Sequence, residues 1–525
     1  MRLLIEQTAG HEPARPLPFE TVSMTALSLL DYMILAGYLA GITLLGASYR
    51  SGQRNARDFF LAGRSMSWFP MVLSVIATDF SAISFLGAPG YVIAHDIVID
   101  IQVLTFIWVL PISFYLFVRF FHGMELISAY EYLERRFSLP LRTICSLLFI
   151  CVRMGWMATA LYATSLALAA ATALPFWACV SIIGGLTSIY SSLGGMRAVI
   201  WTDVAQFFVF IGAIIVVVAT STSAVPGGFG SILRTAAAAG HTRILNFEGG
   251  FESITTPAVL IGGTFLVLIS YGVDQVVIQR YLTAQDLRQI RKAMMFQVCA
   301  TPLVLAALVV IGLSVFGFYQ HFPERIPAGL EPDEWFPHFI VNELPVGVSG
   351  LVIAGLFAAT MSSISSGLNS LTAACVIDFY RRFGGATRHA AQSDVDRHEV
   401  RLSRVLTVVW GFAATGLAFA VGQLGVIAVI SKTLSGFFGG VLLGVFLLGI
   451  LVTRANEQGA LLGAAIGFAT ICAVGLATPI NLFWYAPIGC TATFLPGALA
   501  STLFRSPAPG KIAGLTLHSP VHRQA

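Results

Sequence analysis

Charged side chains are scarce in this sequence. Asp, Glu, Lys and Arg make up 11% of its 525 residues, whereas 56% of the residues are hydrophobic, and the mean hydropathy is +0.81. Soluble globular domains carry about 25% charged residues, so the composition excludes that class. The small net charge of +4 indicates no nucleic-acid partner. The chain is therefore expected to cross a lipid bilayer several times.

Motifs that carry covalent chemistry are also missing. The sequence has no nucleotide-binding glycine loop, no HExxH zinc motif and no nucleophile elbow. Its longest polar connections, 224–254, 320–346 and 379–402, are too short for a catalytic domain. The seven cysteines are scattered singly and are expected to be small packing residues. We therefore expect no enzyme activity and neither catalytic nor cofactor-binding residues.

Long apolar runs, by contrast, are abundant. A membrane-spanning helix needs about 20 apolar residues, and the continuous rather than alternating pattern excludes membrane-spanning strands. The sequence thus predicts an all-α integral membrane protein with an extracytoplasmic segment (1–25), one transmembrane domain (26–502) and a cytoplasmic tail (503–525). The thirteen predicted helices lie near 26–48, 67–94, 99–119, 143–172, 176–193, 203–223, 255–279, 296–319, 347–378, 403–424, 427–451, 458–478 and 481–502.

The distribution of Lys and Arg predicts the orientation of these helices. Connections on one side of the membrane are rich in basic residues, whereas the opposite segment 321–345 is acidic. The positive-inside rule then places the N-terminus outside and the C-terminus in the cytoplasm of a multi-pass cell (plasma or inner) membrane protein. The basic residues assigned to the inner side are Arg50, Arg54, Arg57, Arg64, Arg135, Arg136, Arg288, Arg291, Lys292, Arg381, Arg382, Arg397 and Arg401.

Two predicted spans contain signs of interruption. The second span carries Asp79 in its middle and a Gly-Ala-Pro-Gly cluster at 87–90, which is expected to interrupt the helix. The seventh span contains Ser-Tyr-Gly-Val-Asp-Gln at 270–275, five spans later. Two discontinuous helices at this separation predict a five-plus-five inverted repeat. The repeats would cover about 67–223 and 255–451, with 26–48, 458–478 and 481–502 peripheral. For Asp79 a structural cap on an unwound turn remains the alternative.

A serine-rich stripe lies in the ninth span. Residues 355–370 contain six serines and threonines and no charged residue. Helical periodicity places Ala359, Ser362, Ser363, Ser366 and Ser370 on one face. Hydroxyl and carbonyl oxygens without His, Cys or paired carboxylates suit a weakly bound alkali cation better than Zn²⁺ or Ca²⁺. Close helix packing by small residues is an equally good interpretation of the stripe alone.

Isolated charges in or beside the spans are further candidates for function. Asp203, at the start of the sixth span, is either a solvated helix cap or directed toward the serine stripe. Arg153 in the fourth span is expected to snorkel or to pair with a carboxylate. Lys432 is the only Lys in a predicted span. It should face a wet cavity, a carboxylate such as Asp100, or an anionic ligand.

Several motifs resemble the sodium:solute symporter family, and the resemblance extends over about residues 26–500. The family implies a LeuT-type fold and alternating-access symport of a small solute with one or two sodium ions. A solute-sensing receptor is a weaker alternative, because the tail contains no kinase module. The motifs are DFFLAGRSMSW (58–68), GGLTSIYSSLGGMRAVIWTDVAQFF (184–208), DQVVIQRYL (274–282), SSISSGLNSLTAACVIDFY (362–380) and GILVTRANEQGALLGAAIGFA (449–469).

The resemblance also implies ion ligands by motif position. A first sodium ion would bind the carbonyl oxygens of Ala77, Phe80 and Ala359 and the hydroxyls of Ser362 and Ser363. Asp79 would support this site. A second sodium ion, which some members bind, would use Asp203, Ser365 and Ser366 and share Ser362.

The solute is less closely defined by the resemblance. The pocket residues of the sugar carriers are not reproduced, since Ser84, Ser270 and Thr301 occupy three of those positions and Lys432 replaces a glutamine. The pattern is closer to the iodide, vitamin and monocarboxylate branch. It implies a small anionic organic solute bound near Ser84, Ser270 and Lys432, with a sugar or another neutral solute as the alternative.

Overall fold

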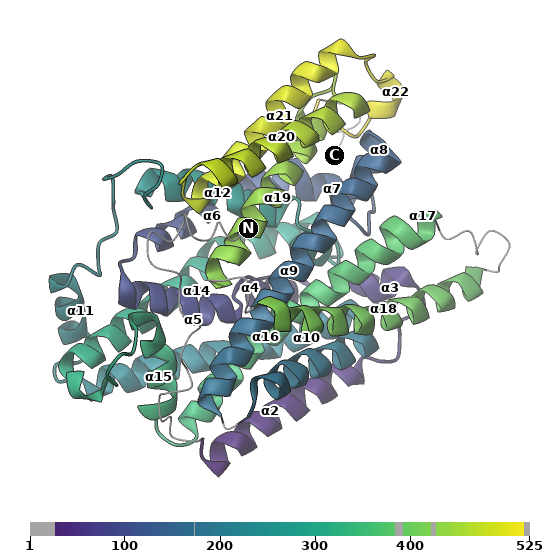
Figure 1. Cartoon of the computed structure of the whole chain (residues 1–525). Coiled ribbons are helices and arrows are strands. Elements are labelled where there is room, and N and C mark those ends of the chain that lie inside the picture. The colour runs from purple at the N-terminus through teal and green to yellow at the C-terminus, as the bar shows by residue number, and fades with distance from the viewer. Residues whose placement is uncertain (1–26, 173, 384–391, 422–426, 519–525) are drawn as a thin grey trace.

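The structure, a computed structural model, describes residues 27–172, 174–383, 392–421 and 427–518, so the predicted segment 1–25 lies outside it. Across these ranges the regular structure is helical, and extended pairing is limited to a single bridge between Met66 and Ala284. Figure 1 shows long helices packed against one another. The predicted all-α class is confirmed. The physical reason is that a helix satisfies its own backbone hydrogen-bonding groups in lipid.

The first half of the chain contains the first broken helix pair and the longest helix. Short 3₁₀ or π turns join some helices, such as Val98–Thr105 before α6 and Phe114–Val118 after it. The helices are α2 (Leu29–Ser48), α3 (Ala56–Leu61), α4 (Trp68–Asp79), α5 (Ala82–Ala94), α6 (Phe106–Ser113), α7 (Arg119–Gly123), α8 (Glu131–Arg136), α9 (Leu139–Ala171), α10 (Phe176–Ala224) and α11 (Gly228–Ala238).

The second half contains the second broken pair and the serine-bearing helix. Its helices are α12 (Thr256–Gly272), α13 (Gln275–Tyr281), α14 (Leu287–His321), α15 (Trp335–Asn342), α16 (Val348–Ala374), α17 (Arg381–Phe383), α18 (Gln392–Val421), α19 (Ile427–Leu451), α20 (Glu457–Ala477), α21 (Tyr485–Leu503) and α22 (Pro509–Ile512).

The predicted count of thirteen spans is not confirmed. Within the described ranges, 9 helices are long and apolar enough to cross a membrane, or up to 11 if each bent pair is one span. The predicted spans 176–193 and 203–223 lie on either side of a kink in α10 at Gly195, whose φ of 57° and ψ of −157° are not helical. The predicted span 427–451 falls in α19. Its segment Gly436–Leu451 is apolar but shorter than the helices counted as able to cross a membrane.

Both interrupted spans are present, but the first breaks earlier than the sequence suggested. α4 and α5 meet at a bend of 56° and α12 and α13 at a bend of 54°. The first break lies at Phe80 and Ser81, and α5 continues through Pro89. A proline removes one N–H donor, which a helix can accommodate with a local adjustment. The Ser81 hydroxyl and the Asp274 carboxylate cap the new helix starts, accepting from Ile83 N and Val276 N.

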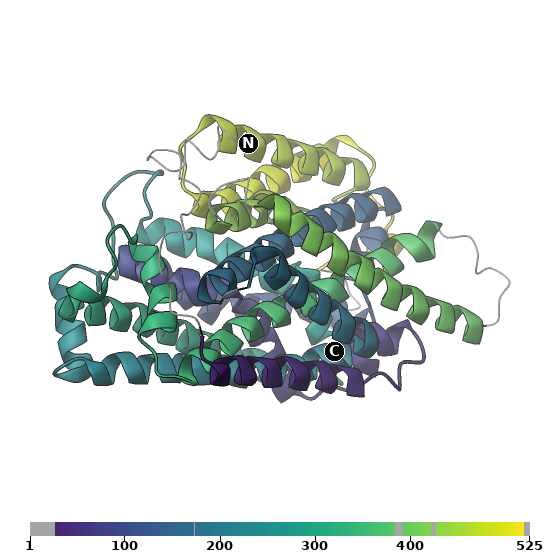
Figure 2. The same cartoon turned by 60° about the horizontal axis from the view of Figure 1, so that its bottom comes forward.

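The serine-bearing helix α16 lies at the centre of the molecule. Its residues are almost all buried, and α10, α2 and α9 pack around it. Its N-terminus is fixed by Asp31 of α2, whose carboxylate accepts hydrogen bonds of 2.8 Å from the backbone N–H groups of Gly347 and Gly350. α2 and the pair α20–α21 lie at opposite edges of the molecule (Figures 1 and 2). The repeat boundaries stay a prediction.

Candidate functional site

Two serines of α16 meet the end of α4 where that helix breaks. The Ser362 hydroxyl lies 2.9 Å from the Ala77 carbonyl oxygen and 3.0 Å from the Ala359 carbonyl oxygen. The Ser363 hydroxyl donates to the Thr78 carbonyl oxygen over 3.2 Å. Both serine side chains are fully buried. The structure therefore brings together Ala77, Ala359, Ser362 and Ser363, four of the five oxygen donors implied for the first ion.

The fifth implied donor, Phe80, lies at the break itself. Its dihedral angles, φ −97° and ψ 96°, are extended, which takes its peptide group out of the regular helix. The hydroxyls nearby can turn their protons away and offer lone pairs to a cation. Among the described residues, no three His, Cys, Asp or Glu side chains gather as metal ligands. Neutral oxygens at a helix break suit a singly charged hard cation.

Asp203 is directed inward, which resolves the choice between a solvated cap and a buried group. It is fully buried, and its Oδ2 atom accepts hydrogen bonds from the Ser74 hydroxyl at 2.6 Å and from the Arg280 guanidinium at 3.0 Å. Arg280 also donates to the Ser366 hydroxyl. The Ser365 side chain lies close to Asp203. The structure thus gathers Asp203, Ser365 and Ser366, the residues implied for a second ion, around Arg280.

Arg280 is the residue that the sequence reasoning missed. The predicted seventh span, 255–279, ended one residue before Arg280, because the spans were predicted as runs of apolar residues and a charged residue ends such a run. Arg280 lies in the last turn of α13, and its side chain is fully buried. The available signal was its place in the DQVVIQRYL motif, six residues after Asp274. A buried arginine needs a carboxylate partner, which Asp203 provides.

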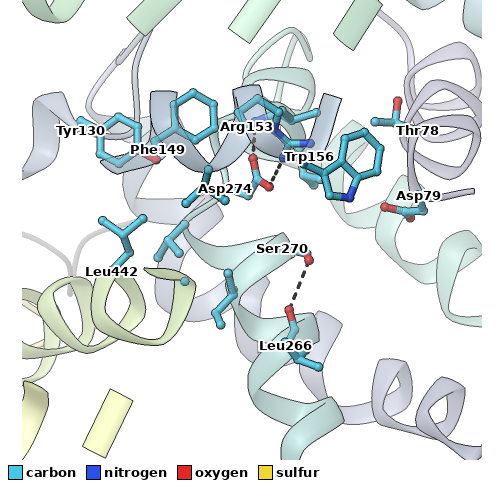
Figure 3. A pocket seen from close by; sticks show the side chains of 16 residues that line it. Thr78, Asp79, Tyr130, Phe149, Arg153, Trp156, Leu266, Ser270, Asp274 and Leu442 are labelled. Atoms are coloured by element: carbon cyan, nitrogen blue, oxygen red, sulfur yellow. Dashed lines mark hydrogen bonds and ion pairs between the residues drawn. The ribbon is translucent and has the colours of Figure 1, made fainter. Parts of the chain in front are cut away.

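A cavity of about 220 Å³ lies between the two helix breaks (Figure 3). It contains polar groups from both breaks, Asp79 and Asp274, together with an aromatic wall. Its lining residues are Thr78, Asp79, Tyr130, Phe149, Val152, Arg153, Trp156, Leu266, Ile269, Ser270, Val273, Asp274, Val276, Val277, Gly439 and Leu442.

Arg153 of α9 lines this cavity. Its guanidinium forms an ion pair with Asp274, the residue that caps α13 (Figure 3). The guanidinium carbon also lies 5.2 Å from the Trp156 ring and 6.0 Å from the Phe149 ring. The expectation that Arg153 pairs with a carboxylate is met at the second break. The pair is partly exposed, with 12% and 21% of the two side chains accessible, so a polar ligand can reach it.

Asp79 connects the first break to the second half of the molecule. Its Oδ2 atom accepts hydrogen bonds from the Tyr271 hydroxyl and, at 3.2 Å, from the Gln297 amide. The Gln297 carbonyl oxygen in turn accepts from the Tyr281 hydroxyl at 2.8 Å. The carboxylate is therefore held by α12 and α14. Its support of the first ion site stays a prediction.

The residues predicted for the solute divide into three cases. Ser270 lines the cavity, and its hydroxyl donates to the Leu266 carbonyl oxygen at 3.2 Å (Figure 3). Ser84 is half-buried on α5 and is not part of the lining. Lys432 belongs to α19, but its side chain lies outside the described residues. Arg153, which was not predicted as a solute residue, is part of the lining.

Comparisons with known proteins agree over most of the chain. A family model described as the sodium:solute symporter family matches residues 59–467. The sodium/sialic acid symporter NanT of Aliivibrio fischeri is 33% identical over 482 residues, covering 91% of this chain and 94% of that protein. The human sodium-coupled monocarboxylate transporter 1 is 30% identical over 491 residues, covering 90% of this chain and 78% of that protein.

Solved structures give the same picture. A substrate-bound, outward-open Na⁺-coupled sialic acid symporter matches with a TM-score of 0.86 at 30% identity, covering 91% of this chain and 98% of that chain. A nucleobase-cation-symport-1 family transporter matches with a TM-score of 0.58 at 13% identity, covering 88% of this chain and 98% of that chain. At this low identity the match shows a shared fold and no more. The expected LeuT-type fold is confirmed.

Proposed function

Because the chain belongs to the sodium:solute symporter family, we propose that the cavity between its two helix breaks binds a small carboxylate-bearing solute for import with sodium. The protein is a multi-pass membrane transporter and not an enzyme. Its sodium coupling follows from the family and from its similarity to Na⁺-coupled symporters. The chain's own residues support a proposal for the chemical class of the solute and for the positions of the ions.

Arg153 is the observation that supports an anionic solute. Among the described residues lining the cavity it is the only cation, and its partner Asp274 is partly exposed. A guanidinium can hold a solute carboxylate through two parallel hydrogen bonds. The rings of Phe149 and Trp156 offer apolar contact to the remainder of the solute. Relatives that carry sialic acid and monocarboxylates support this class, and Ser270 is a further polar contact.

The charges around the two breaks support two sodium ions for each anion. Arg153 and Arg280 face the carboxylates of Asp79, Asp203 and Asp274 in this region. When all five are ionised, one negative charge remains uncompensated among these five side chains, a count that leaves out Lys432 because its side chain is outside the described residues. A bound solute carboxylate adds a second negative charge. Because unpaired charge away from water is costly, two monovalent cations would leave the loaded region neutral.

We place the two ions at the α4 break and at Asp203. The first would bind the carbonyl oxygens of Ala77, Phe80 and Ala359 with the Ser362 and Ser363 hydroxyls, supported by Asp79. The second would bind near Asp203, with Ser365 and Ser366 as the candidates taken from the sequence. Sodium at the break would order α4 and α5 and stabilise the outward-open state. Solute and sodium then strengthen each other's binding, typically by about 1–3 kcal/mol.

The orientation remains that indicated by the basic connections. We propose a cell-membrane location with the N-terminus outside and the C-terminus in the cytoplasm, supported by the positive-inside distribution of Lys and Arg. The inside-negative potential then favours inward movement of a net positive charge, by about 2.3 kcal/mol per charge per 100 mV.

Uptake into proteoliposomes tests this function. Sialic acid and short monocarboxylates are offered with and without an inward sodium gradient, each beside its uncharged amide analogue. We expect sodium-dependent uptake of a carboxylate and little uptake of its amide. Binding is checked separately by thermal unfolding, since a ligand at 100 times its Kd stabilises the protein by about 2.7 kcal/mol. Uptake that ignores the sodium gradient contradicts symport, and equal uptake of the amide contradicts an anionic solute.

A further inference from the structure

Tyr130 lies at one end of the solute cavity. Its side chain is fully buried and belongs to the cavity lining, and its ring centroid is 5.6 Å from that of Phe149. Figure 3 shows Tyr130 and Asp79 at opposite ends of the cavity, with Arg153 and Asp274 between them in this view. Tyr130 directly precedes α8, whose arginines belong to the basic connections of the inner side. It therefore marks the inner end of the cavity.

Gln275 holds the short segment that carries Tyr130, residues 127–131, which we call the inner segment. The Gln275 Oε1 atom accepts a hydrogen bond from the Ala129 N–H group at 2.8 Å, and its Nε2 atom donates to the Ile127 carbonyl oxygen at 2.9 Å. The Gln275 side chain is fully buried. Because both bonds go to the backbone and are protected from water, they fix the inner segment against the start of α13.

A group of charged side chains holds the inner segment from a second direction. The Ser128 hydroxyl donates to Asp378 Oδ2 at 2.9 Å, just beyond the end of α16. Asp378 is fully buried and pairs with Arg142 of α9, which also pairs with Glu134 of α8. The inner segment is therefore attached both to α13, beside the solute cavity, and to the inner ends of the helices around it.

Gln275 directly follows the carboxylate that a bound solute would disturb. Asp274 caps α13 by accepting from the Val276 N–H group at 2.9 Å, and it pairs with Arg153 in the cavity. A solute carboxylate at Arg153 would compete with Asp274 for the guanidinium and place a like charge beside it. Displacement of Asp274 moves the start of α13, and Gln275 moves with it because the two residues are consecutive.

We propose that the inner segment is the gate at the inner end of the cavity, and that Gln275 couples the binding of a solute carboxylate at Arg153 to the opening of this gate. The inference rests on the proposed function and adds the route by which the solute opens the path to the cytoplasm. Without solute, the two hydrogen bonds of Gln275 keep the gate closed. The solute weakens them through Asp274, which shifts the population toward the inward-open state. A purely structural role of Gln275 is the competing explanation.

Three variants separate a gate from a structural support. Gln275→Leu removes both hydrogen bonds to the inner segment with little change in side-chain volume. Ser128→Ala cuts the bond to Asp378 and is the milder change if Gln275→Leu folds poorly. Gln279→Leu is the matched control, because Gln279 is also fully buried in α13 but donates to the Phe60 carbonyl oxygen and to Asn369.

The access of water-soluble reagents to the cavity measures the state of the gate. Val152→Cys places a thiol in the cavity lining, and a membrane-impermeant maleimide labels it in right-side-out and inside-out vesicles, with labelling of the native cysteines subtracted. In sodium without solute, we expect the wild type to react chiefly from the outside. Gln275→Leu and Ser128→Ala should raise the labelling rate from the inner side about tenfold, the effect of losing about one buried hydrogen bond. Gln279→Leu should label like the wild type.

Hydrogen exchange of the inner segment tests the coupling to the solute. Saturating sialic acid or a short monocarboxylate, whichever the protein takes up, should speed exchange of the Ala129 amide in the wild type and not in Arg153→Gln. If Gln275→Leu and Ser128→Ala leave inner labelling unchanged, or if a transported carboxylate leaves the exchange unchanged, the proposal is wrong. A wild type that takes up no carboxylate contradicts the proposed function instead, and the labelling still decides whether the inner segment is the gate.

Discussion

At the scale of single residues, this transporter depends on oxygen atoms and charges held in fixed positions. Ser362 and Ser363 attach α16 to the broken end of α4. Arg153 and Arg280 each hold a carboxylate that lies far away in sequence. The roles proposed for these side chains are in binding rather than in covalent chemistry, so they are tested as changes in affinity for an ion or a solute.

Ser363→Ala tests the first ion site. The change removes one hydroxyl ligand, and alanine suits a tightly packed membrane helix. A lost hydrogen-bonding or ligand contact of about 1–1.5 kcal/mol corresponds to a roughly tenfold rise in the sodium concentration for half-maximal uptake. Ser370→Ala is the control, because this serine lies on the same face but bonds to Gln279 and to the Ser366 carbonyl oxygen. An equal effect of both substitutions would count against the assignment.

Arg153→Gln tests recognition of the carboxylate. Loss of a charge-assisted hydrogen bond should weaken binding of the carboxylate solute by about 1.5–3 kcal/mol, while sodium affinity measured without solute changes little. Since the substitution leaves Asp274 unpaired, the double variant Arg153→Gln with Asp274→Asn serves as the charge-balanced control. Competition with the amide analogue in a binding assay measures the loss of selectivity.

Lys432→Gln addresses the residue that the sequence favoured. If the preference for a carboxylate over its amide is lost in this variant and kept in Arg153→Gln, the solute anion binds Lys432 and the assignment of Arg153 is wrong. If Arg153→Gln alone loses the preference, Arg153 is the anion-binding residue.

At the scale of elements, two breaks and one turn position these residues. The breaks end α4 and α12, and residues next to both of them, Thr78 and Asp79 at the first and Val273 and Asp274 at the second, line the cavity. They are joined by the hydrogen bond from Tyr271 to Asp79. The turn in α10 at Gly195 separates Tyr190, whose hydroxyl donates to the Met361 carbonyl oxygen, from Asp203.

Gly195→Ala tests that turn. Gly195 has φ 57° and ψ −157°, a region that non-glycine residues occupy at a cost of about 1–3 kcal/mol. An added Cβ would also lie 2.7 Å from the Phe59 carbonyl oxygen. We expect less folded protein in the membrane and a lower unfolding temperature. Gly212→Ala in the same helix meets no neighbouring atom and should behave like the wild type in fluorescence-detected size-exclusion chromatography.

At the scale of the whole molecule, charge balance links the solute to the ions. Two sodium ions with one monoanion carry a net positive charge inward in each cycle, whereas one sodium ion with one monoanion carries none. The stoichiometry is therefore visible as a response to voltage, without reference to any single ligand residue.

A potassium diffusion potential set with valinomycin measures this response. At 100 mV inside-negative, one net charge is worth about 2.3 kcal/mol, which raises the attainable accumulation of solute by about 50-fold. Uptake that is independent of voltage would indicate one sodium ion per monoanion and would contradict the second ion site. If an uncharged solute were carried with the same two ions, two net charges would move inward, so the membrane potential would contribute twice as much free energy to its accumulation.

Composition and periodicity were sufficient for the class of protein, the positions of most spans, the second helix break and the serine stripe. These follow from local rules, because a lipid-facing helix must be apolar along its own length and a helical face repeats with a fixed period. The motifs were sufficient for the family. By motif position they also indicated Ala77, Ala359, Ser362 and Ser363, which the structure brings together, while their role as ion ligands stays a prediction.

Only the tertiary structure decided which charges meet. Arg280 pairs with Asp203 across 77 positions of the chain, and Arg153 pairs with Asp274 across 121. A local sequence pattern cannot predict partners so far apart in the chain, since a buried charge pairs with whichever opposite charge helix packing brings near. The exact place of the first break, at Phe80 rather than at Pro89, likewise depends on the helices that cap and surround it. The sequence therefore determined the family and the kinds of residue available for ions and a solute, whereas helix packing determined which of those side chains lie together.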